Sequence, residues 1–538
     1  MKATLRASSK ALTPSVIELF GGTMTSVAPN EDVLSLVMHH AEERPEALAV
    51  KDDLEALNYG DLARRAAQVA GGLAAAGAAP GDRVAVLLDN SAAWVTVALG
   101  CLWLGAAFVP FRAGDPPARL GRLLDNCSPR AIVTKGADEL ATGYSSSREA
   151  VAHVNLGALL GRAGPVPEMC EDPGADAYVI YTSGTTGGPK GVRISRRAFA
   201  HSVVTTSRLV GYDATARSLC VSAFYFDGSY GIVFPTLVAG GRLIIPRREE
   251  LAFLKRFYSS VRDEEITHTS FSPTYLRLVL STPRASGLAG TALGSLCLGG
   301  EQCMAADVAK IKELLPGLRV FNRYGPTEAT VAVTSYEVSG DDLRSGRVPI
   351  GVPHPGTSFW LLKDDGSIEG TPGRVGELYI GGSQLMEGYW GDDALSRSVL
   401  VRGVDPDGPA YKTGDLAYRD EQGRYFFVGR CDDVVKRRSL RISLEELSGA
   451  LRGADGVRGA VCIAADIRGE LGIIAFVEAD AGVTAAGLLS ETSSHIPERM
   501  QPDEVHVVEV LPMSPRGKVD REELLASVGR VPWRQTGT

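Results

Sequence analysis

The chain has 538 residues, a length that one hydrophobic core seldom fills, so we expect two or more domains. Hydrophobic residues make up 44% and charged residues 22% of the sequence, close to the globular average, which excludes wholesale disorder. The 56 Lys and Arg against 64 Asp and Glu give a net charge of -8. A mildly acidic chain is a poor candidate for nucleic-acid binding, which needs a positive surface.

Cysteine spacing and hydropathy exclude two further classes. The eight cysteines contain no CxxC pair, so neither a zinc site nor a disulfide framework is indicated, and a cytoplasmic protein is expected. The stretch Ser91–Pro110 carries no charge and would just span a bilayer. We favour the other interpretation, a buried helix, a turn at Gly105 and a short strand ending at Pro110, and expect no membrane association.

Strand-like and helix-like runs alternate along the first part of the chain. Strands are predicted at Ala47–Val50, Val84–Leu88 and Ala131–Thr134, and helices at Asp61–Ala76, Ala92–Leu104 and Pro117–Asn126. This rhythm indicates a mostly parallel sheet with helices on both faces. Residues 137–176 are rich in Gly, Ala, Ser and Pro and are predicted to be loop with short helices, and the alternation then continues from Tyr178 through Leu298.

The pattern changes twice further along. Short strands at Phe359–Leu362, Glu377–Ile380 and Arg424–Val428 lie between Gly-rich turns and indicate a small β unit. Beyond Arg430 the composition becomes charged, and strands at Ala460–Ala465 and Leu471–Ala479 lie among helical runs. We therefore predict an α/β protein with a large N-terminal domain over 1–430, made of βα subdomains plus a small β-barrel-like unit, and a small mobile α+β C-terminal domain over 431–538.

One Gly-, Ser- and Thr-rich segment, Tyr181 to Gly191, follows a predicted strand at Ala177–Ile180. Such a turn offers backbone N–H groups and hydroxyls to phosphate oxygens, and Lys190 adds a cation. It is not a Walker A loop, because no Gly-Lys-Ser/Thr triplet closes it. The segment predicts a phosphate-binding loop rather than a simple linker.

This segment resembles the phosphate loop of the adenylate-forming enzymes, which include acyl-CoA synthetases, luciferases and the adenylation domains of nonribosomal peptide synthetases. Further motifs of that family follow in order, and together they cover most of the chain: the NxYGPTE-like run from Asn322, Gly376–Gly382, Tyr411–Leu416, Gly429–Asp432 and Leu511–Lys518. The resemblance implies a fold and an activity, in which a carboxylate attacks the α-phosphate of ATP and expels pyrophosphate, with Mg²⁺ as cofactor.

The resemblance also assigns residues to the two nucleotide-dependent roles. The departing phosphates would be held by Thr182, Ser183, Gly184, Thr185, Thr186 and Lys190, and the nucleoside by Gly299, Gly300, Glu301, Tyr324, Gly325, Thr327, Asp415 and Arg430. Glu328 would bind Mg²⁺, a hard cation suited to carboxylate and phosphate oxygen. Lys518 would bridge the substrate carboxylate and the α-phosphate as a catalytic residue.

The substrate class is suggested by Phe226–Ser229, which resembles the segment that places an Asp against the ammonium of an amino acid. Asp227 lies in an apolar context and would need a cationic partner, although it is also a candidate N-cap for a helix at Tyr230–Leu237. By offset within the motifs, the amino-acid pocket is predicted to comprise Asp227, Gly228, Gly231, Ser270, Cys297, Gly299, Arg323, Val331 and Ala332.

Arg323 is the informative member of this set, because a guanidinium in a pocket calls for a carboxylate. The substrate is therefore expected to carry a second carboxylate, as aspartate, glutamate or a β-amino acid such as 3-methylaspartate do. Stand-alone adenylation enzymes of β-amino-acid macrolactam pathways are similar in this respect. The alternative is that Arg323 pairs with a protein acid and points away from the pocket.

Finally, the resemblance implies transfer of the acyl group to a thiol. The small C-terminal domain would rotate about a hinge at Asp432 between the two half-reactions and bring Lys436 to the thiol channel. No Ser-centred carrier motif follows Lys518, so we expect a stand-alone ligase of secondary-metabolite biosynthesis that acts on a separate phosphopantetheine carrier protein. The alternatives are an acyl-CoA synthetase for a small carboxylic acid, and, from another class, a luciferase-like oxygenase or a catalytically silent adenylate-binding protein.

Overall fold

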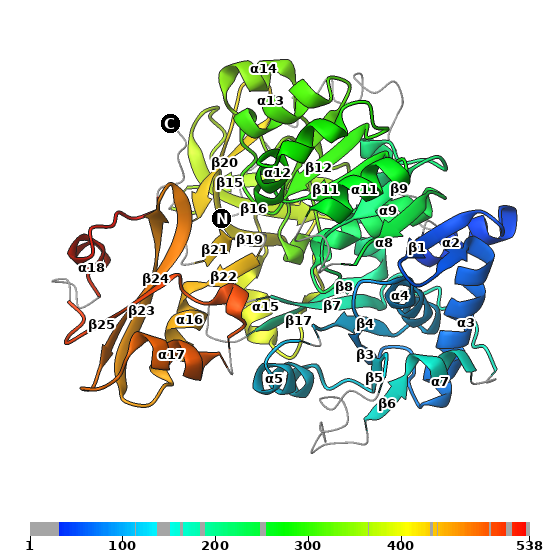
Figure 1. Cartoon of the computed structure of the whole chain (residues 1–538), viewed down its shortest axis with the longest axis horizontal. Coiled ribbons are helices and arrows are strands. Elements are labelled where there is room, and N and C mark those ends of the chain that lie inside the picture. The colour runs from blue at the N-terminus through cyan, green and yellow to red at the C-terminus, as the bar shows by residue number, and fades with distance from the viewer. Residues whose placement is uncertain are drawn as a thin grey trace, which may run out of the picture.

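The computed structural model describes residues 32–112, 114–136, 151–161, 165–182, 189–247, 254–363, 365–430, 434–437, 440–493, 496–512 and 519–533. Among these residues, two mixed sheets with covering helices form the larger part of the molecule (Figure 1). A five-stranded antiparallel sheet and a C-terminal α+β part complete it.

The first mixed sheet has a parallel centre extended by two antiparallel strands. Its order is β17 (Gly388–Tyr389), β8 (Lys190–Ser195), β7 (Asp176–Thr182), β4 (Ala107–Pro110), β3 (Arg83–Leu87), β5 (Ala131–Thr134) and β6 (Ala152–Asn155). The run from β7 to β6 is parallel, whereas β8 and β17 pair antiparallel. The helices of this region are α2 (Val33–Glu43), α3 (Tyr59–Ala75), α4 (Ala92–Leu104), α5 (Pro117–Cys127) and α7 (Leu156–Gly161).

The second mixed sheet repeats this arrangement with a longer parallel centre. Its order is β14 (Tyr336–Glu337), β13 (Arg319–Arg323), β12 (Ser295–Gly299), β11 (His268–Phe271), β9 (Arg217–Cys220), β10 (Arg242–Ile245), β1 (Leu48–Asp52) and β2 (Ala56–Asn58), with only the two edge strands antiparallel. Its helices are α8 (Arg196–Val210), α9 (Tyr230–Val238), α11 (Lys255–Asp263), α12 (Pro273–Leu280), α13 (Ala305–Leu314) and α14 (Gly340–Ser345), with short 3₁₀ turns η1 (Asp227–Ser229), η2 (Pro283–Leu288) and η3 (Thr327–Ala329).

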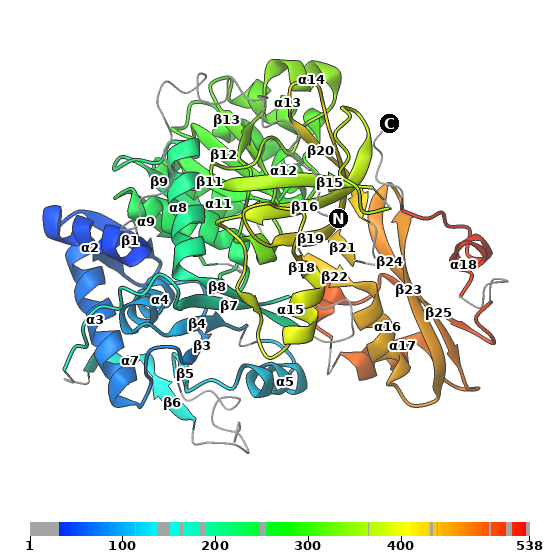
Figure 2. The same cartoon turned by 180° about the vertical axis from the view of Figure 1, so that it is seen from behind.

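Along the chain, the antiparallel sheet follows the strands of the second mixed sheet and precedes the C-terminal part (Figure 2). It contains β15 (Thr357–Leu362), β16 (Val375–Gly382), β19 (Ala410–Arg419), β18 (Leu400–Val401) and β20 (Tyr425–Arg430), with α15 (Asp393–Val399) before β18. Its buried face packs Phe359, Leu378 and Ile380 with Tyr324 in one hydrophobic cluster. This contact fixes the sheet beside the end of β13.

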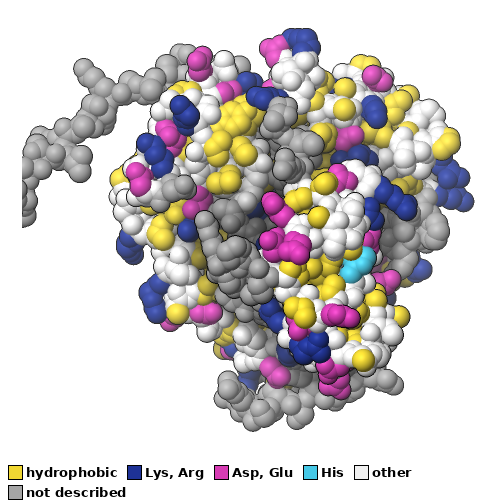
Figure 3. Space-filling view, turned by 90° about the vertical axis from the view of Figure 1, so that its left-hand side faces the viewer, with side chains coloured by type: hydrophobic (Ala, Val, Ile, Leu, Met, Phe, Trp, Pro, Cys, Tyr) yellow, Lys and Arg dark blue, Asp and Glu magenta, His cyan; other side chains and the backbone are white. Residues whose placement is uncertain are grey.

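The C-terminal part has its own hydrophobic cores. A hairpin of β21 (Val434–Arg437) and β22 (Leu440–Ser443) leads to α16 (Leu444–Arg452) and to a sheet of β23 (Val457–Ile467), β24 (Glu470–Ala479) and β25 (Glu504–Val508), with α17 (Ala485–Thr492), η4 (Glu498–Met500) and α18 (Arg521–Ser527). One core lies under α16 and α17, and a second lies on the opposite side with α18. Seen from this side, acidic and basic side chains are intermixed on the face (Figure 3).

Helix α4 explains the long uncharged run of the sequence. Ser91 caps its N-terminus by accepting a hydrogen bond from Trp94 N (3.2 Å), and Gly105 ends it with a φ of 79°, a left-handed conformation that favours glycine. Eleven of its 13 residues are buried, which accounts for its apolar composition on all sides. The strand β4 follows directly and ends at Pro110, so the predicted helix, turn and strand are confirmed.

Two ion pairs join the C-terminal part to helix α5 and the turn before it. Arg119 donates to Glu446 at the start of α16 (3.0 Å), and Arg499 of η4 donates to Asp115 (3.0 Å). Phe226 also packs against the core under α16 and α17. The C-terminal part is therefore seated against the segments that surround Asp227.

The predicted α/β fold class is confirmed, with one local correction. Within 137–176, predicted to be loop with short helices, β6 extends the first mixed sheet by a further parallel strand and α7 is the expected short helix. The strand AHVN is only four residues long, too short for its alternation to stand out among the surrounding residues, so its pairing with β5 was not predicted. The domain boundary near 430 stays a prediction.

Candidate functional site

A cavity opens where the carboxyl ends of strands from both mixed sheets meet. Ser270 lies near the end of β11, Gly299 is the last residue of β12 and Gly300 follows it. Arg323 ends β13 and Thr182 ends β7, and all five residues line the cavity. Ligands of α/β proteins bind at such strand ends because the loops that leave them diverge. Leu440, Arg499 and Met500 of the C-terminal part close one side.

Asp227 places an enclosed carboxylate on this cavity. It lies in η1 just before α9, and α9 has no side-chain N-cap, so the capping alternative does not apply. Its Oδ2 atom is buried and has no hydrogen-bond partner among the described residues. Burial raises the pKa of Asp227 to about 6, a hydrogen bond from Thr327 opposes this, and the nearby charge of Glu328 adds to it. An orphaned carboxylate oxygen in a cavity fits a cationic ligand.

Arg323 presents a guanidinium to the same cavity. Its side chain is 7% exposed, Nη1 donates to Gly231 O (2.9 Å) and Nη2 donates to Thr206 Oγ1 (3.1 Å). Its Nε is buried without a hydrogen-bond partner, and no acidic side chain forms an ion pair with Arg323 in the described part of the chain. The structure therefore does not have the alternative arrangement, in which a protein acid pairs with Arg323 and holds it away from the pocket.

The other predicted pocket residues divide into two groups. Gly228, Ser270, Gly299, Val331 and Ala332 line the cavity with Asp227 and Arg323. Gly231 and Cys297 do not line it. Gly231 lies under the Arg323 guanidinium, where an added Cβ would come within 3.0 Å of Cζ. Cys297 is packed in a cluster with Tyr212 and Phe321, its thiol next to Arg323, and burial raises the pKa of that thiol.

A second group of polar residues lies on the antiparallel sheet at the other end of the cavity. Asp415, 1% exposed, forms an ion pair with Arg430 across the β19–β20 ladder and accepts a hydrogen bond from Tyr324 Oη (2.5 Å). Burial and the Asp415 charge hold the pKa of Tyr324 well above its usual range, so the phenol stays a donor. A carboxylate accepts more than two hydrogen bonds, which leaves Asp415 capacity for a diol.

Of the remaining predicted nucleotide residues that the structure describes, all but Glu301 and Lys190 line the cavity. Thr182, Gly299, Gly300, Gly325 and Thr327 line the cavity beside Asp415 and Arg430. Glu301 does not line it and instead accepts hydrogen bonds from Thr274 N (3.0 Å) and Thr274 Oγ1 (2.6 Å). Its carboxylate thus binds the N-terminal end of α12.

The family model of the AMP-binding enzymes matches residues 37–390 of the chain. The chain belongs to this family. Curated relatives agree with the match. It is 30% identical over 519 residues to tyrocidine synthase 3 of Brevibacillus parabrevis, covering 95% of this chain and 8% of that protein. It is 31% identical to isonitrile lipopeptide synthase of Streptomyces coeruleorubidus, covering 93% and 34% respectively.

Solved structures of the AMP-binding family have the same fold. IdnL1 is 28% identical with a TM-score of 0.74, and the match covers 90% of this chain and 98% of that one. The o-succinylbenzoate CoA synthetase of Bacillus subtilis is 21% identical with a TM-score of 0.79, covering 91% and 98%. The family match and the curated relatives confirm the predicted membership in the adenylate-forming enzymes of the nonribosomal-peptide-synthetase type.

The curated relatives are much longer than this AMP-binding chain. It spans 8%, 14% and 10% of the length of three of them. Its described residues include no helix long and apolar enough to cross a lipid bilayer.

Glu328 provides the test of whether the site fits the Mg²⁺ that AMP-binding enzymes use. It is 1% exposed, and its Oε1 accepts a hydrogen bond from Tyr389 Oη (2.8 Å). Lys190 Nζ lies 5.3 Å from the centroid of the same tyrosine ring. The described residues contain no cluster of three His, Cys, Asp or Glu side chains. One carboxylate, with Lys190 near the same tyrosine, fits a hard cation held mainly by phosphate oxygens.

Several predicted residues lie outside what the structure describes. These are Ser183, Gly184, Thr185, Thr186, Asp432 and Lys518. Lys436 is part of β21 and pairs with Arg441 in the hairpin register. Their predicted roles stay predictions.

Sequence analysis missed residues that complete the site. Tyr389 supports Glu328, Thr206 supports Arg323, and Arg499 closes the cavity from the C-terminal part. Thr206 lies mid-helix in α8 and is 117 residues away from Arg323 in the sequence, so only the three-dimensional arrangement identifies it.

Proposed function

We propose that this protein activates an amino acid with a second carboxylate as its aminoacyl adenylate and transfers the acyl group to the phosphopantetheine thiol of a carrier protein. The observation that carries the proposal is the pair of opposite charges in one cavity. Asp227 offers an enclosed carboxylate with a free oxygen, and Arg323 offers a guanidinium that no protein acid neutralises in the described residues. A zwitterion with an additional acid group satisfies both.

The nucleotide half of the site supports adenylation. Asp415, positioned by Arg430 and Tyr324, would accept hydrogen bonds from the ribose hydroxyls of ATP. Gly299 and Gly300 leave room for the adenine beside the strand end, because neither has a side chain. Bound Mg²⁺ supplies charge neutralisation of the phosphates.

The reaction joins two anions, so this chain must orient them and offset their repulsion. Asp227 would hold the substrate ammonium and thereby fix which carboxylate approaches the α-phosphate. Lys190, Lys518 and Arg430 would provide the cationic groups around the reacting phosphate. The substrate carboxylate oxygen forms the new P–O bond, and pyrophosphate leaves with the electron pair of the broken one.

Arg323 would recognise the second carboxylate. Its buried Nε is a donor without an acceptor among the described residues, and a carboxylate would accept a hydrogen bond from it. Among the three substrate types considered, aspartate, glutamate and 3-methylaspartate differ in how far this carboxylate lies from the amino group. The distance that the pocket accepts decides among them.

Transfer to a thiol would use the C-terminal domain, which we place from residue 431 onward with its hinge at Asp432. In the present arrangement, Leu440 of the β21–β22 hairpin lines the cavity, whereas α18 lies at the outer edge of the molecule (Figures 1 and 2). The position of this hairpin, which contains Lys436, supports the proposed thiol-transfer step.

Amino-acid-dependent exchange of pyrophosphate into ATP tests the proposal. We expect a panel of common amino acids and β-amino acids to give exchange with dicarboxylic members and none with their des-amino analogues, which an acyl-CoA synthetase would accept. Asp227→Ala should abolish exchange with every amino acid, whereas Arg323→Ala should lose the acidic substrates selectively. Lys518→Ala with undiminished exchange, or a wild-type protein that forms no adenylate with any member, contradicts the proposal.

A further inference from the structure

The segment Thr330 to Ala332, whose last two residues form part of the cavity wall, has an unusual backbone. Thr330 and Val331 have φ values of 57° and 69°, so two consecutive β-branched residues adopt the left-handed region. Each such residue is unfavourable and persists only where neighbouring contacts over-determine it. Val331 and Ala332 line the cavity that holds Asp227 and Arg323.

One glutamine holds most of this segment. Gln384, fully buried between β16 and β17, donates through Nε2 to Ala332 O (2.8 Å) and Thr330 O (3.3 Å), and Ala329 O lies at 3.5 Å. Its backbone oxygen accepts a hydrogen bond from Thr330 Oγ1 (2.6 Å). Because carbonyl oxygens only accept, the amide nitrogen must be the atom that faces them.

A buried histidine fixes the other end of the glutamine amide. His354 Nδ1 lies 3.1 Å from Gln384 Oε1, and Ser335 Oγ lies 3.1 Å from His354 Nε2. Burial lowers the pKa of His354 to about 3, so the ring is neutral. Since Gln384 Oε1 only accepts, Nδ1 carries the proton and Nε2 accepts from the serine. The amide therefore has one orientation.

The contacts turn the carbonyl groups of the segment toward Gln384 and away from the cavity, leaving Val331 and Ala332 on the cavity wall. The segment packs closely against Gly325, where an added Cβ would lie 2.5 Å from Ala332 Cα and 2.8 Å from Val331 O, so the absence of a side chain at Gly325 permits this approach. We propose that Gln384 is a positioning residue that sets the apolar wall of the amino-acid pocket and so determines which substrate side chains fit. This inference rests on the proposed amino-acid activation.

The test is steady-state pyrophosphate exchange with Gln384→Met, which keeps the length of the side chain and removes both amide atoms. We expect the KM for the preferred amino acid to rise about tenfold or more while the KM for ATP changes less than about threefold. We also expect the preference between substrates that differ by one methylene to shrink. A change at exposed Gln422, Gln422→Met, is the matched control and should alter neither value.

A second variant keeps the inference testable if Gln384→Met does not fold. Ser202 Oγ also donates to Thr330 O (2.8 Å) without lining the cavity, so Ser202→Ala should raise the amino-acid KM in the same direction by a smaller factor. Unchanged amino-acid KM and selectivity in a folded variant, or equal rises in the amino-acid and ATP KM values, would overturn the role of Gln384. A wild-type protein without amino-acid-dependent exchange would instead overturn the proposed function.

Discussion

Asp227 is held at an energetic cost that its proposed role explains. A carboxylate is desolvated in the cavity, and its pKa of about 6 shows that the folded protein favours the neutral form relative to the unfolded chain. Sites that bind a charged ligand commonly retain such unfavourable groups, because the ligand compensates them. The cost is therefore expected to disappear when the carboxylate is replaced by its amide.

We predict that Asp227→Asn stabilises the free protein while it abolishes exchange. Because the folded pKa lies above the unfolded value, wild-type stability falls as pH rises from about 4 to about 6 and stays lower above that range. The Asp227→Asn variant does not lose stability in this way, so at pH 7.5 its free energy of unfolding should exceed that of the wild type by about 2 kcal/mol. Thermal midpoints measured from pH 4 to 8 should diverge between pH 4 and 6. Parallel curves would contradict the assignment.

Arg323 and Gly231 act as a pair. The Arg323 guanidinium occupies the place of the missing Gly231 side chain, and an added Cβ would lie within 3.0 Å of Cζ. We predict that Gly231→Ala displaces the guanidinium and lowers kcat/KM for acidic substrates about tenfold or more, with a smaller effect on neutral amino acids. Gly287→Ala is the matched control, because its Cβ would meet no atom within 4 Å and Gly287 does not line the cavity. Equal losses of kcat/KM for acidic and neutral substrates, or the same selectivity change in the control, would contradict a role of Arg323 in carboxylate recognition.

At this scale the sequence indicated which residue types matter but not always how they act. Motif offsets placed Asp227 and Arg323 on the cavity, whereas Gly231 proved to be the seat of Arg323 and Cys297 a packed thiol behind it. Gln384 had no signal, because its partners are backbone carbonyls 52 to 55 residues earlier in the chain. Backbone acceptors have no residue identity that a motif could register.

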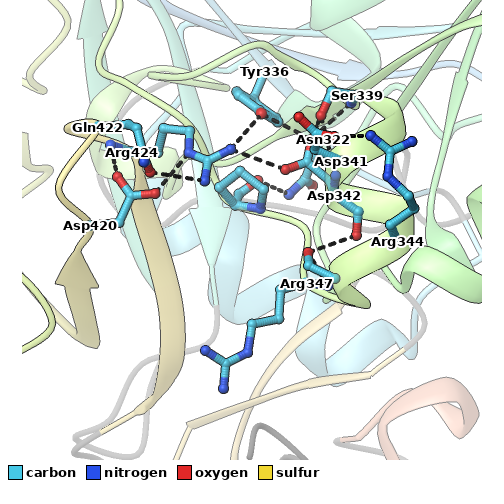
Figure 4. Close-up of polar contacts among 12 residues, drawn as sticks. Asn322, Tyr336, Ser339, Asp341, Asp342, Arg344, Arg347, Asp420, Gln422 and Arg424 are labelled. Atoms are coloured by element: carbon cyan, nitrogen blue, oxygen red, sulfur yellow. Dashed lines mark hydrogen bonds and ion pairs between the residues drawn. The ribbon is translucent and has the colours of Figure 1, made fainter.

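The elements are joined by a polar network between α14 and the β19–β20 turn (Figure 4). Asp342, 2% exposed, accepts from Tyr336 Oη (2.9 Å), Ser339 N (2.8 Å) and Arg424 Nη1 (3.2 Å). Arg424 also pairs with Asp420 (2.8 Å). The network ties the second mixed sheet to the strands that carry Asp415 and Arg430, at the end opposite those residues.

We predict that Arg424→Met lowers the free energy of unfolding by about 1–3 kcal/mol, because Asp342 then remains buried without its cation. A double-mutant cycle with Asp342→Asn in urea unfolding should show coupling, since the double variant leaves no uncompensated charge. The pair Arg344–Asp341 in the same figure is the control. Its side chains are 74% and 80% exposed, so Arg344→Met should cost less than about 0.5 kcal/mol. Additive losses in the cycle would exclude a coupled network.

The elements themselves were predictable where the local signal was strong. Helix α4 was placed at its observed bounds because Ser91 and Gly105 mark both ends of an apolar run. The strands β14, β17 and β18 have two residues each and exist only through pairing with β13, β8 and β19, so local sequence had no basis for them. The four-residue strand β6 was likewise too short to be predicted from local sequence.

On the scale of the whole molecule, the seating of the C-terminal part is the feature on which the proposed transfer step depends. The Arg119–Glu446 and Arg499–Asp115 pairs join residues 327 and 384 positions apart, so no sequence pattern predicted them. The side chains of Arg119 and Glu446 are 11% and 6% exposed. A desolvated pair of this kind biases a domain orientation, because opening must separate and rehydrate the two charges.

We predict that Glu446→Gln separates the two half-reactions. The present arrangement presents the β21–β22 hairpin to the cavity, so weakening the pair should reduce the population of the transfer-competent orientation. Single-turnover transfer from the adenylate to the carrier thiol should slow about tenfold, while pyrophosphate exchange stays within about twofold of the wild type. Glu446 does not line the main cavity, so a direct effect on adenylation is not expected.

Glu522→Gln, on the exposed face of α18 in the same C-terminal part, is the control and should leave both rates unchanged. Equal slowing of exchange and transfer by Glu446→Gln would mean that the pair supports the fold in general. Unaltered transfer would mean that the Arg499–Asp115 pair and the apolar contact at Phe226 suffice to position the C-terminal domain. A selective loss of transfer would mean that this ion pair does more than seat the domain. It would also set how often the hairpin, rather than the segment containing Lys518, faces the adenylate.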